Sequence, residues 1–289
     1  MWRTSLLLFL PILVGQSPAQ KPSSALEQAA RNKRERLLEI YSGDAAGYAI
    51  YRDRNHKEKV VLQHEPVYVW TNPVRDGGQD GAVFVWTCRG RVEVVGSVFS
   101  FPATGPRKLV HEFHTLSLSV LDVRRPGPHT WTPEAPGVEL TPIAGAPLPA
   151  RLAAQRLAQM RALTREFSAS TQDDKGNSWK LRLLPRPLYR YESTDPDVAD
   201  GALFSFVTSA GTDPEALLVL EARKPAPDRD PAWHFAIARF TDLNLWVRHE
   251  GSEVFTAALI PYGSPQQDPK HRYRLIEDRV LTPVEDHAP

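Results

Sequence analysis

The feature that most constrains the fold of this chain is a pattern of residues that occurs twice. Residues 66–70 (PVYVW) and 80–86 (DGAVFVW) return as residues 187–191 (PLYRY) and 200–206 (DGALFSF). Self-similarity at a nearly fixed spacing is the signature of a repeated structural unit. The recurring residues are aromatic, apolar and turn-forming, so the pattern carries information about architecture and little about chemistry.

A predicted helix precedes each copy of the pattern. Residues 24–41 begin with the capping-box residues Ser24 and Glu27, and residues 151–167 place apolar side chains three and four positions apart. After each helix the apolar period changes to two, and Asp-Gly and Asn-Pro turns separate the segments. A last strand of the second copy is predicted over residues 233–247.

These patterns predict an α+β fold made of two tandem homologous repeats. Each repeat is expected to be an N-terminal helix followed by a four- to five-stranded antiparallel β-meander, and the two are expected to pack about a pseudo-two-fold axis. The boundaries divide the chain into a signal peptide, the first repeat, a proline-rich linker, the second repeat and a polar C-terminal tail: 1–19, 20–125, 126–150, 151–262 and 263–289. Within the tail, residues 273–281 are a candidate for one short strand.

The N-terminal segment predicts a secreted or periplasmic protein. Arg3, a short apolar run and a small-residue cleavage site ending at Ala19 are typical of a secretory signal peptide. The apolar run has about ten residues, roughly half of what a membrane span needs, so no span is expected after cleavage. Removal of Arg3 leaves 34 Lys and Arg against 34 Asp and Glu. A chain without net positive charge has no electrostatic potential that would attract nucleic acid, so nucleic acid is not expected as a partner.

Cysteine usage adds one constraint. Cys88 is the sole cysteine, so no intrachain disulfide can form. Stability in an oxidising compartment must therefore come from burial of apolar side chains. Cys88 lies beside Trp86 in an apolar run, which predicts a buried and unreactive thiol.

Three phrases of the sequence carry a family resemblance. They are residues 80–84 (DGAVF), 183–191 (LLPRPLYRY) and 200–204 (DGALF), and the matching region covers most of residues 34–260. With the predicted leader, they resemble an uncharacterised family of secreted proteins from planctomycete-type bacteria. That family has no assigned activity, so the resemblance implies export and supplies no function.

Rings on neighbouring predicted strands are the first candidate for a ligand site. Tyr68 and Trp70 share one strand face, Tyr189 and Tyr191 share the matching face in the second copy, and Trp86 stands one strand further on. Such rows of rings either fill the core of a β-protein or form a stacking wall for a sugar or another flat ligand. The exchange of Trp70 for Tyr191 between copies keeps the volume and loses the indole donor, which favours packing.

The densest polar cluster is His111-Glu112-Phe113-His114. On a strand alternate residues share a face, so Glu112 and His114 would point together, while His111 would lie with Phe113. His111, Glu112 and His114 are candidate metal ligands, but such a site needs a supporting shell, and the zinc helix motif places its histidines four positions apart. A polar strand edge is the alternative interpretation.

Other catalytic patterns are missing from the sequence. No Gly-x-Ser-x-Gly elbow, phosphate-binding glycine loop, dinucleotide fingerprint or calcium loop occurs, and no cofactor is expected. Glu93 and Glu215 occupy equivalent positions in the two copies and could face each other as an acid pair for glycoside cleavage. Solvated strand ends are the alternative interpretation of these two glutamates.

The sequence therefore favours a non-enzymatic binding or envelope-associated protein. Its partner would be a small molecule, a glycan or an envelope protein that meets the seam between the two halves. The alternative is a hydrolase, metal-dependent or not, with a site near His111, Glu112 and His114. A structural component of a larger envelope assembly is a third hypothesis.

Overall fold

The computed structural model describes residues 24–103, 105–128, 130–224, 230–261 and 268–282. This part of the chain forms 18 β-strands, two α-helices and one short 3-10 helix, so the protein is mostly β. The predicted signal peptide lies outside the described residues. None of the helices that are described is long and apolar enough to cross a membrane.

The first sheet has eight antiparallel strands in the order β18-β6-β5-β4-β2-β1-β7, with β3 paired to β4. The strands are β1 (Ala49–Tyr51), β2 (Lys59–Leu62), β3 (Tyr68–Asn72), β4 (Gln79–Cys88), β5 (Arg91–Ala103), β6 (Gly105–Thr115), β7 (Asp122–Arg124) and β18 (Tyr273–Val280). The candidate strand in the predicted polar tail is present as β18, and it is an edge strand beside β6.

The second part of the chain forms two separate sheets. Six strands run in the order β11-β13-β14-β15-β8, with β12 paired to β13, and four run in the order β10-β9-β16-β17. The strands are β8 (Thr141–Pro142), β9 (Phe167–Gln172), β10 (Ser178–Lys180), β11 (Arg182–Leu183), β12 (Tyr189–Tyr191), β13 (Val198–Val207), β14 (Pro214–Arg223), β15 (Ala232–Arg239), β16 (Asn244–His249) and β17 (Ser252–Ala257). The single strand predicted over residues 233–247 is wrong, because residues 240–243 break it into β15 and β16.

The predicted α+β class, with a helix and one small meander in each of two repeats, is wrong. The helix α2 (Ala153–Leu163) continues into η1 (Thr164–Glu166) and buries only Met160 and Leu163. The cover over the six-stranded sheet comes largely from strands instead, since β9 and β16 pack on β13 and β14 in one apolar cluster. One narrow helical stripe is too small to cover sheets of this size, and curled strands supply the rest.

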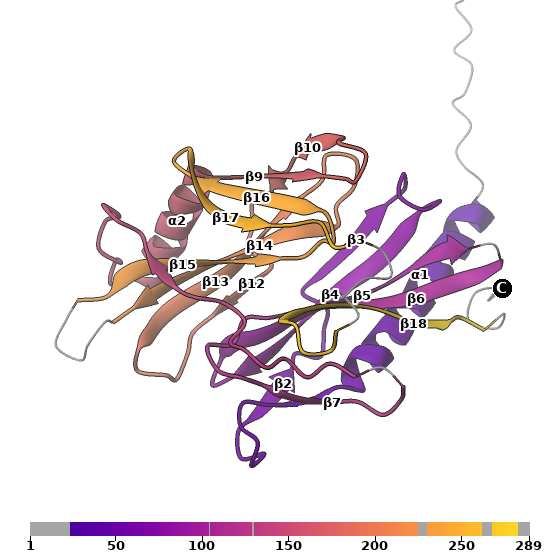
Figure 1. The fold of residues 1–289 in the computed structure, drawn as a ribbon, viewed down its shortest axis with the longest axis horizontal. Helices are drawn as coiled ribbons and strands as arrows, with labels where there is room; N and C mark the ends of the chain where they lie inside the picture. Colours follow the sequence, from indigo (N-terminus) through magenta and orange to yellow (C-terminus); the bar gives the residue numbers. More distant parts are fainter. Residues whose placement is uncertain (1–23, 104, 129, 225–229, 262–267, 283–289) are drawn as a thin grey trace, which may run out of the picture.

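The first sheet curls in a similar way and carries a helix on its outer face. The helix α1 (Ser24–Ala46) lies behind β4, β5 and β6 in Figure 1. It buries Leu37, Tyr41 and Ala45 against a cluster that includes Trp86 and Phe113. The strand β2 makes the bend, because its first residues pair with β1 and its last residues pair with β4.

The two large sheets pack face to face on a third apolar cluster, which we call the seam. Its members come from both sheets and include Val83, Val95, Leu203 and Leu217. Both faces of β4 and β13 are therefore covered, which explains why their residues are buried almost without alternation. The prediction left open whether the halves share one sheet; they form separate sheets.

Candidate functional site

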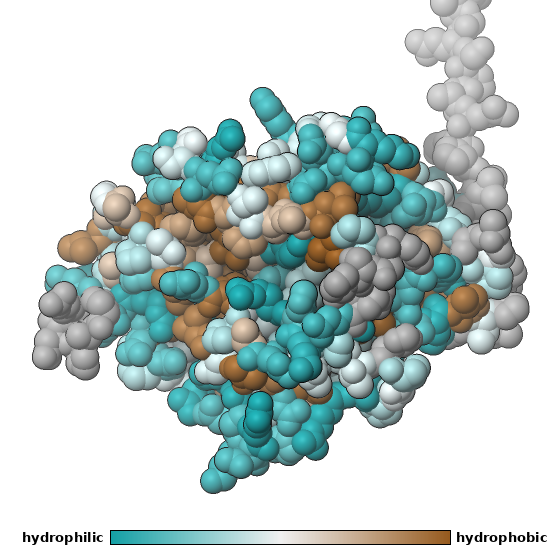
Figure 2. Space-filling view, viewed as in Figure 1, coloured by the Kyte–Doolittle hydropathy of each residue, from teal (hydrophilic) through white to brown (hydrophobic). Residues whose placement is uncertain are grey.

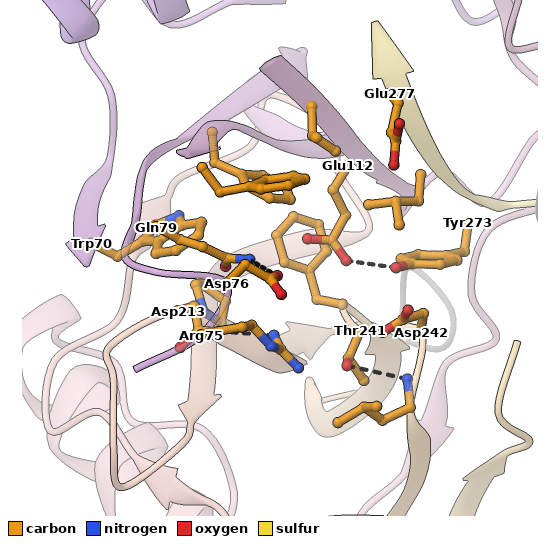
Figure 3. A pocket seen from close by; sticks show the side chains of 17 residues that line it. Trp70, Arg75, Asp76, Gln79, Glu112, Asp213, Thr241, Asp242, Tyr273 and Glu277 are labelled. Carbon is orange, nitrogen blue, oxygen red and sulfur yellow. Dashed lines mark hydrogen bonds and ion pairs between the residues drawn. The ribbon is translucent and has the colours of Figure 1, made fainter. Parts of the chain in front are cut away.

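The candidate site is a cavity of about 310 Å³ at one end of the seam. Figure 3 shows that side chains from both large sheets and from the connections between strands point into it. We call it the seam cavity. Its aromatic and polar lining residues are Trp70, Phe99, Phe101, Phe240 and Tyr273, and Arg75, Asp76, Gln79, Glu112, Asp213, Thr241, Asp242 and Glu277.

The ring of Trp70 is held flat against β4 by a glycine. A Cβ on Gly81 would lie 2.4 Å from that ring, so no larger residue fits beneath it. The same relation holds in the second half, where a Cβ on Gly201 would lie 2.3 Å from Tyr191. The recurring Asp-Gly-Ala phrase thus has a packing reason. The indole nitrogen of Trp70 donates to Ser97 Oγ at 3.0 Å, which fixes the ring.

Arg75 joins the two halves beside the cavity. Its Nη1 donates to Asp213 Oδ2 and to Glu215 Oε1, both at 3.1 Å. Asn72 adds a bond from Nδ2 to Asp213 Oδ1 at 3.0 Å. Burial raises the pKa of Glu215 to about 7, and the positive charge of Arg75 opposes this only in part. One guanidinium group therefore forms the ion pairs of two carboxyl groups.

Glu112 reaches the cavity from β6, and its carboxyl group points into it (Figure 3). The side chain belongs to a residue that is only 8% exposed, and Tyr273 donates its hydroxyl to Oε1 at 2.6 Å. Among the described residues, the second oxygen has no hydrogen-bond partner. Burial raises the pKa of Glu112 well above its ordinary value.

Three further carboxylates border the cavity. Glu277 forms an ion pair with Lys108 at 3.0 Å, and the exposed Asp76 accepts a hydrogen bond from Gln79 at 2.8 Å. Asp242 is half-buried in the break between β15 and β16. Within the described part of the chain, its carboxylate has no hydrogen-bond or ion-pair partner. Asp242 is therefore the acidic group most available to a ligand.

The structure separates the five aromatic residues that the sequence singled out. Trp70 lines the seam cavity, and Tyr191 lies buried in the seam, where it donates to Glu221 Oε1 at 2.6 Å. Tyr68 and Tyr189 pack half-buried against the edge of the same cluster. Trp86 is fully buried on the opposite face of β4, beside Phe113 under α1. Of the five, Trp70 alone borders this cavity.

The alternation predicted for residues 111–114 is present on β6 and puts His111 on the opposite face from Glu112 and His114. Those two line different cavities, so the three candidate metal ligands do not come together. His111 lies on the α1 side of the sheet, 2.8 Å from the hydroxyl of Tyr48. Glu112 enters the seam cavity, while His114 lines a second cavity of about 440 Å³ with residues of β15 and β17. Figure 2 shows apolar side chains gathered over those two strands. Burial lowers the pKa of His114 to about 3, so it is a neutral imidazole.

His111 does belong to another group that resembles a cation site. Ligand atoms of Asp44, His111 and Asp278 all lie within 4.8 Å of one another. Arg125 already bonds both aspartates, and Arg279 forms an ion pair with Asp44 at 3.2 Å. A metal ion would have to displace a guanidinium from two carboxylates. The arginines therefore supply the positive charge that this group needs.

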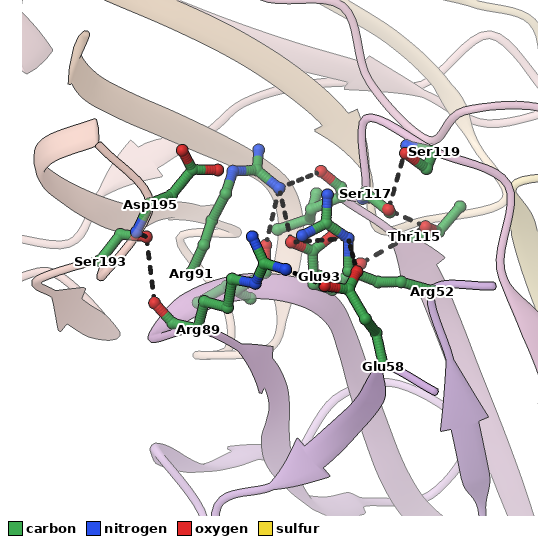
Figure 4. A network of polar contacts seen from close by, with 12 residues as sticks. Arg52, Glu58, Arg89, Arg91, Glu93, Thr115, Ser117, Ser119, Ser193 and Asp195 are labelled. Atoms are coloured by element: carbon green, nitrogen blue, oxygen red, sulfur yellow. Dashed lines mark hydrogen bonds and ion pairs between the residues drawn. The ribbon is translucent and has the colours of Figure 1, made fainter. Parts of the chain in front are cut away.

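Glu93 and Glu215 lie in separate polar networks and do not form a facing pair. Glu93 is buried between Arg91, at 3.5 Å, and Arg52, at 4.0 Å, in the network of Figure 4. Burial raises the pKa of Glu93, as it does for Glu215. The two carboxyls share no partner. The acid pair considered for glycoside cleavage is thus replaced by two separate Arg–Glu contacts.

Sequence reasoning missed Arg75, Asp242 and Tyr273. Arg75 and Asp242 lie in connections between strands, and Tyr273 lies in the segment predicted as a tail. The glycines after Arg75 marked a turn, but no sequence signal related that turn to residues near 242 or 273.

Comparison of the chain with family models, with curated proteins and with solved structures finds no match. The functional argument therefore depends on the seam cavity itself. Its volume lies at the lower end of the range typical of small-molecule sites, and it combines an aromatic wall with a few polar groups. This arrangement can bind a small organic ligand and fix its orientation.

Proposed function

We propose that this protein is a non-enzymatic binding protein, exported to the periplasm or beyond, which holds a small organic ligand in the seam cavity. The observation that carries the proposal is the shared lining. Trp70 and Glu112 come from the first half, and Thr241 and Asp242 come from the second. A ligand in this place would contact both halves at once. The leader-like residues 1–19 support export.

The polar groups of the cavity favour binding over catalysis. Asp213 is engaged by Arg75 and Asn72, and burial raises the pKa of Glu112. Hydrolysis by a carboxyl pair would require Asp242, the unpartnered carboxylate of the described lining, to act from the opposite side of the scissile bond to Glu112. The ring and donor arrangement instead resembles sites that hold a ligand by shape and a few hydrogen bonds.

A cavity-filling substitution tests the proposal. Leu243 lines the cavity and is half-buried, so Leu243→Trp should block it while leaving the fold intact. The matched control is Leu148→Trp, at a site that is 65% exposed. Ligand-observed NMR with a library of neutral, cationic and anionic fragments should give binders to the native protein and to the control, and none of these to Leu243→Trp. Fragments that bind all three proteins equally would contradict the proposal.

A hydrolase is the second candidate, and Glu112 is the observation that favours it. A carboxyl group whose pKa is raised well above its ordinary value can donate a proton to a leaving group. Turnover would be visible in the same NMR samples as the loss of a compound and the appearance of its hydrolysis products. Under this hypothesis the turnover disappears in Glu112→Gln, whereas under the binding hypothesis no compound is consumed by the native protein.

A further inference from the structure

The charges around the seam cavity are unbalanced. Among its described lining residues, Arg75 is the single basic side chain, against five that carry a carboxyl group. Arg75 is already engaged with Asp213 and Glu215. An anionic ligand would therefore find no unengaged cation in the lining, and it would meet several carboxyl groups.

Two of the carboxyl groups have oxygen atoms that point to no protein partner. Glu112 is more than nine-tenths buried, one of its oxygens accepts from Tyr273, and the other faces the cavity without a partner in the described chain (Figure 3). Asp242, described above, is the second. These oxygens are open to the cavity, so a ligand can contact them without displacing a protein partner.

Arg239, a basic residue outside the lining, does not neutralise Asp242 by contact. Arg239 gives its three nitrogens to the backbone oxygens of Thr241, Leu243 and Ala258, at 2.8, 3.0 and 3.0 Å. It lines the neighbouring cavity that contains His114, and it lies 5.0 Å from the ring centroid of Tyr273. Its charge reduces the local negative potential, but no hydrogen bond or ion pair ties it to Asp242.

The aromatic wall adds attraction for the same kind of ligand. Trp70 and Phe99 pack with ring centroids 5.4 Å apart, and both border the cavity. A positive charge near the face of such rings gains about 0.5–2 kcal/mol. A quaternary or protonated amine also offers apolar carbon surface, which the rings can cover.

From these observations we propose that the ligand of the seam cavity is a small organic cation, a protonated amine or quaternary ammonium compound. Its positive nitrogen lies beside the carboxylate of Asp242, and its apolar part lies against Trp70 and Phe99. This inference rests on the proposed binding function and names the chemical class of its ligand.

Three probes of one shape test the inference. They are choline, the uncharged alcohol in which carbon replaces the quaternary nitrogen of choline, and the carboxylate of that same carbon skeleton. Titration of the full mature protein, followed by NMR, should show that choline binds roughly tenfold more tightly than the alcohol and that the carboxylate does not bind. Asp242→Asn should remove most of this preference without changing the affinity for the alcohol. The matched control is Asp230→Asn, an exposed site outside the cavity lining, and it should leave all three affinities unchanged.

Each outcome of the titration has a definite meaning. If the alcohol binds as well as choline and Leu243→Trp blocks both, the cavity is a ligand site but the cation inference is wrong. If the carboxylate binds best, the inference is also wrong. If Asp242→Asn leaves the preference for choline intact, Asp242 is not the counter-charge and the inference fails. If no probe or library fragment binds, the proposed function fails together with the inference.

Discussion

Each end of the seam has an arginine of the first half in contact with a buried glutamate of the second, but the pKa values of the two glutamates shift in opposite directions. At the end beside the cavity, which we call the open end, Arg75 of the first half contacts Glu215 of the second. At the other end, the closed end, Arg91 of the first half contacts Glu221 of the second at 2.8 Å. Both glutamates are buried, yet the pKa of Glu215 is raised to about 7 and that of Glu221 is lowered.

The number of partners explains the difference. Burial alone would raise the pKa of Glu221, but Arg91, Tyr191 and Arg223 all bond to its carboxylate and together outweigh that effect. Glu215 shares one arginine with Asp213, and its Oε2 is buried without a hydrogen-bond partner. At the closed end the carboxylate of Glu221 is thus bonded through both oxygens, although Arg91 Nη2 and Glu93 Oε2 are buried there without a hydrogen-bond partner in the described chain. At the open end the carboxyl group of Glu215 has one bonded oxygen, and the cavity opens beside it.

The largest expected effect is a difference between two arginine substitutions. Arg91→Met leaves the buried Glu221 with Arg223 as its one remaining cation and removes the donor to the backbone oxygen of Leu116, so it should lower the free energy of unfolding by about 3–5 kcal/mol. Arg75→Met should cost roughly 1–2 kcal/mol, because Glu215 can take up a proton near neutral pH. The measurement is urea unfolding at pH 7.

Arg124→Met, at a side chain that is 59% exposed, is the control for the arginine pair. It should change the free energy of unfolding by less than about 0.5 kcal/mol. An equal loss in Arg91→Met and Arg75→Met would remove the proposed distinction between the two ends.

The second expected effect concerns pH. Glu215 binds its proton more tightly in the folded protein, so its contribution to stability is present below its unfolded pKa of about 4.5 and is lost as pH rises through about 7. Glu215→Gln should therefore remove roughly 2–3 kcal/mol of the fall in stability across that range. The check is a series of urea unfolding curves from about pH 4.5 to about pH 8.

For Glu221 we expect stability to depend on pH in the opposite direction. Its pKa is lowered in the folded protein, so its contribution is present above its unfolded pKa and is lost as pH falls through the folded value. Glu221→Gln should therefore reduce the fall in the free energy of unfolding at acidic pH. Near neutral pH, the dependence of that free energy on pH should be the same as in the native protein. If the free energy of unfolding changed with pH in the same way in Glu215→Gln and Glu221→Gln, the proposed difference between the two carboxyl groups would be wrong.

The smallest expected effect compares the turns at the two ends. Gly90 has a φ of 86°, and a Cβ there would lie 2.2 Å from the backbone oxygen of Glu192, so Gly90→Ala should cost about 2 kcal/mol. At the open end a Cβ on Gly211 would meet the side chains of Asn72 and Asp213 at 2.7 Å. Those side chains can shift, so Gly211→Ala should cost about 1 kcal/mol. Thermal unfolding of both variants gives the comparison, and a larger loss for Gly211→Ala would reverse it.

Local sequence patterns predicted several parts of this protein correctly. The alternation of Glu112 and His114 against His111 follows from the period of a strand and holds on β6. The strands β4 and β13 lie where the Asp-Gly-Ala phrases placed them. Patterning failed at residues 240–243, because Phe240, Thr241, Asp242 and Leu243 include no glycine or proline to mark the break.

The sequence by itself determined where most strands lie and which faces of those strands are apolar, because strand periodicity and turn chemistry are local properties. Only the tertiary structure decided that strands would replace helices as the cover of the sheets, and that Arg75, Glu112, Asp242 and Tyr273 would meet around one cavity. Those residues are far apart in the chain and share no pattern. Their meeting depends on how two curled sheets pack, which is set by the sum of many burial contacts and by no single local signal.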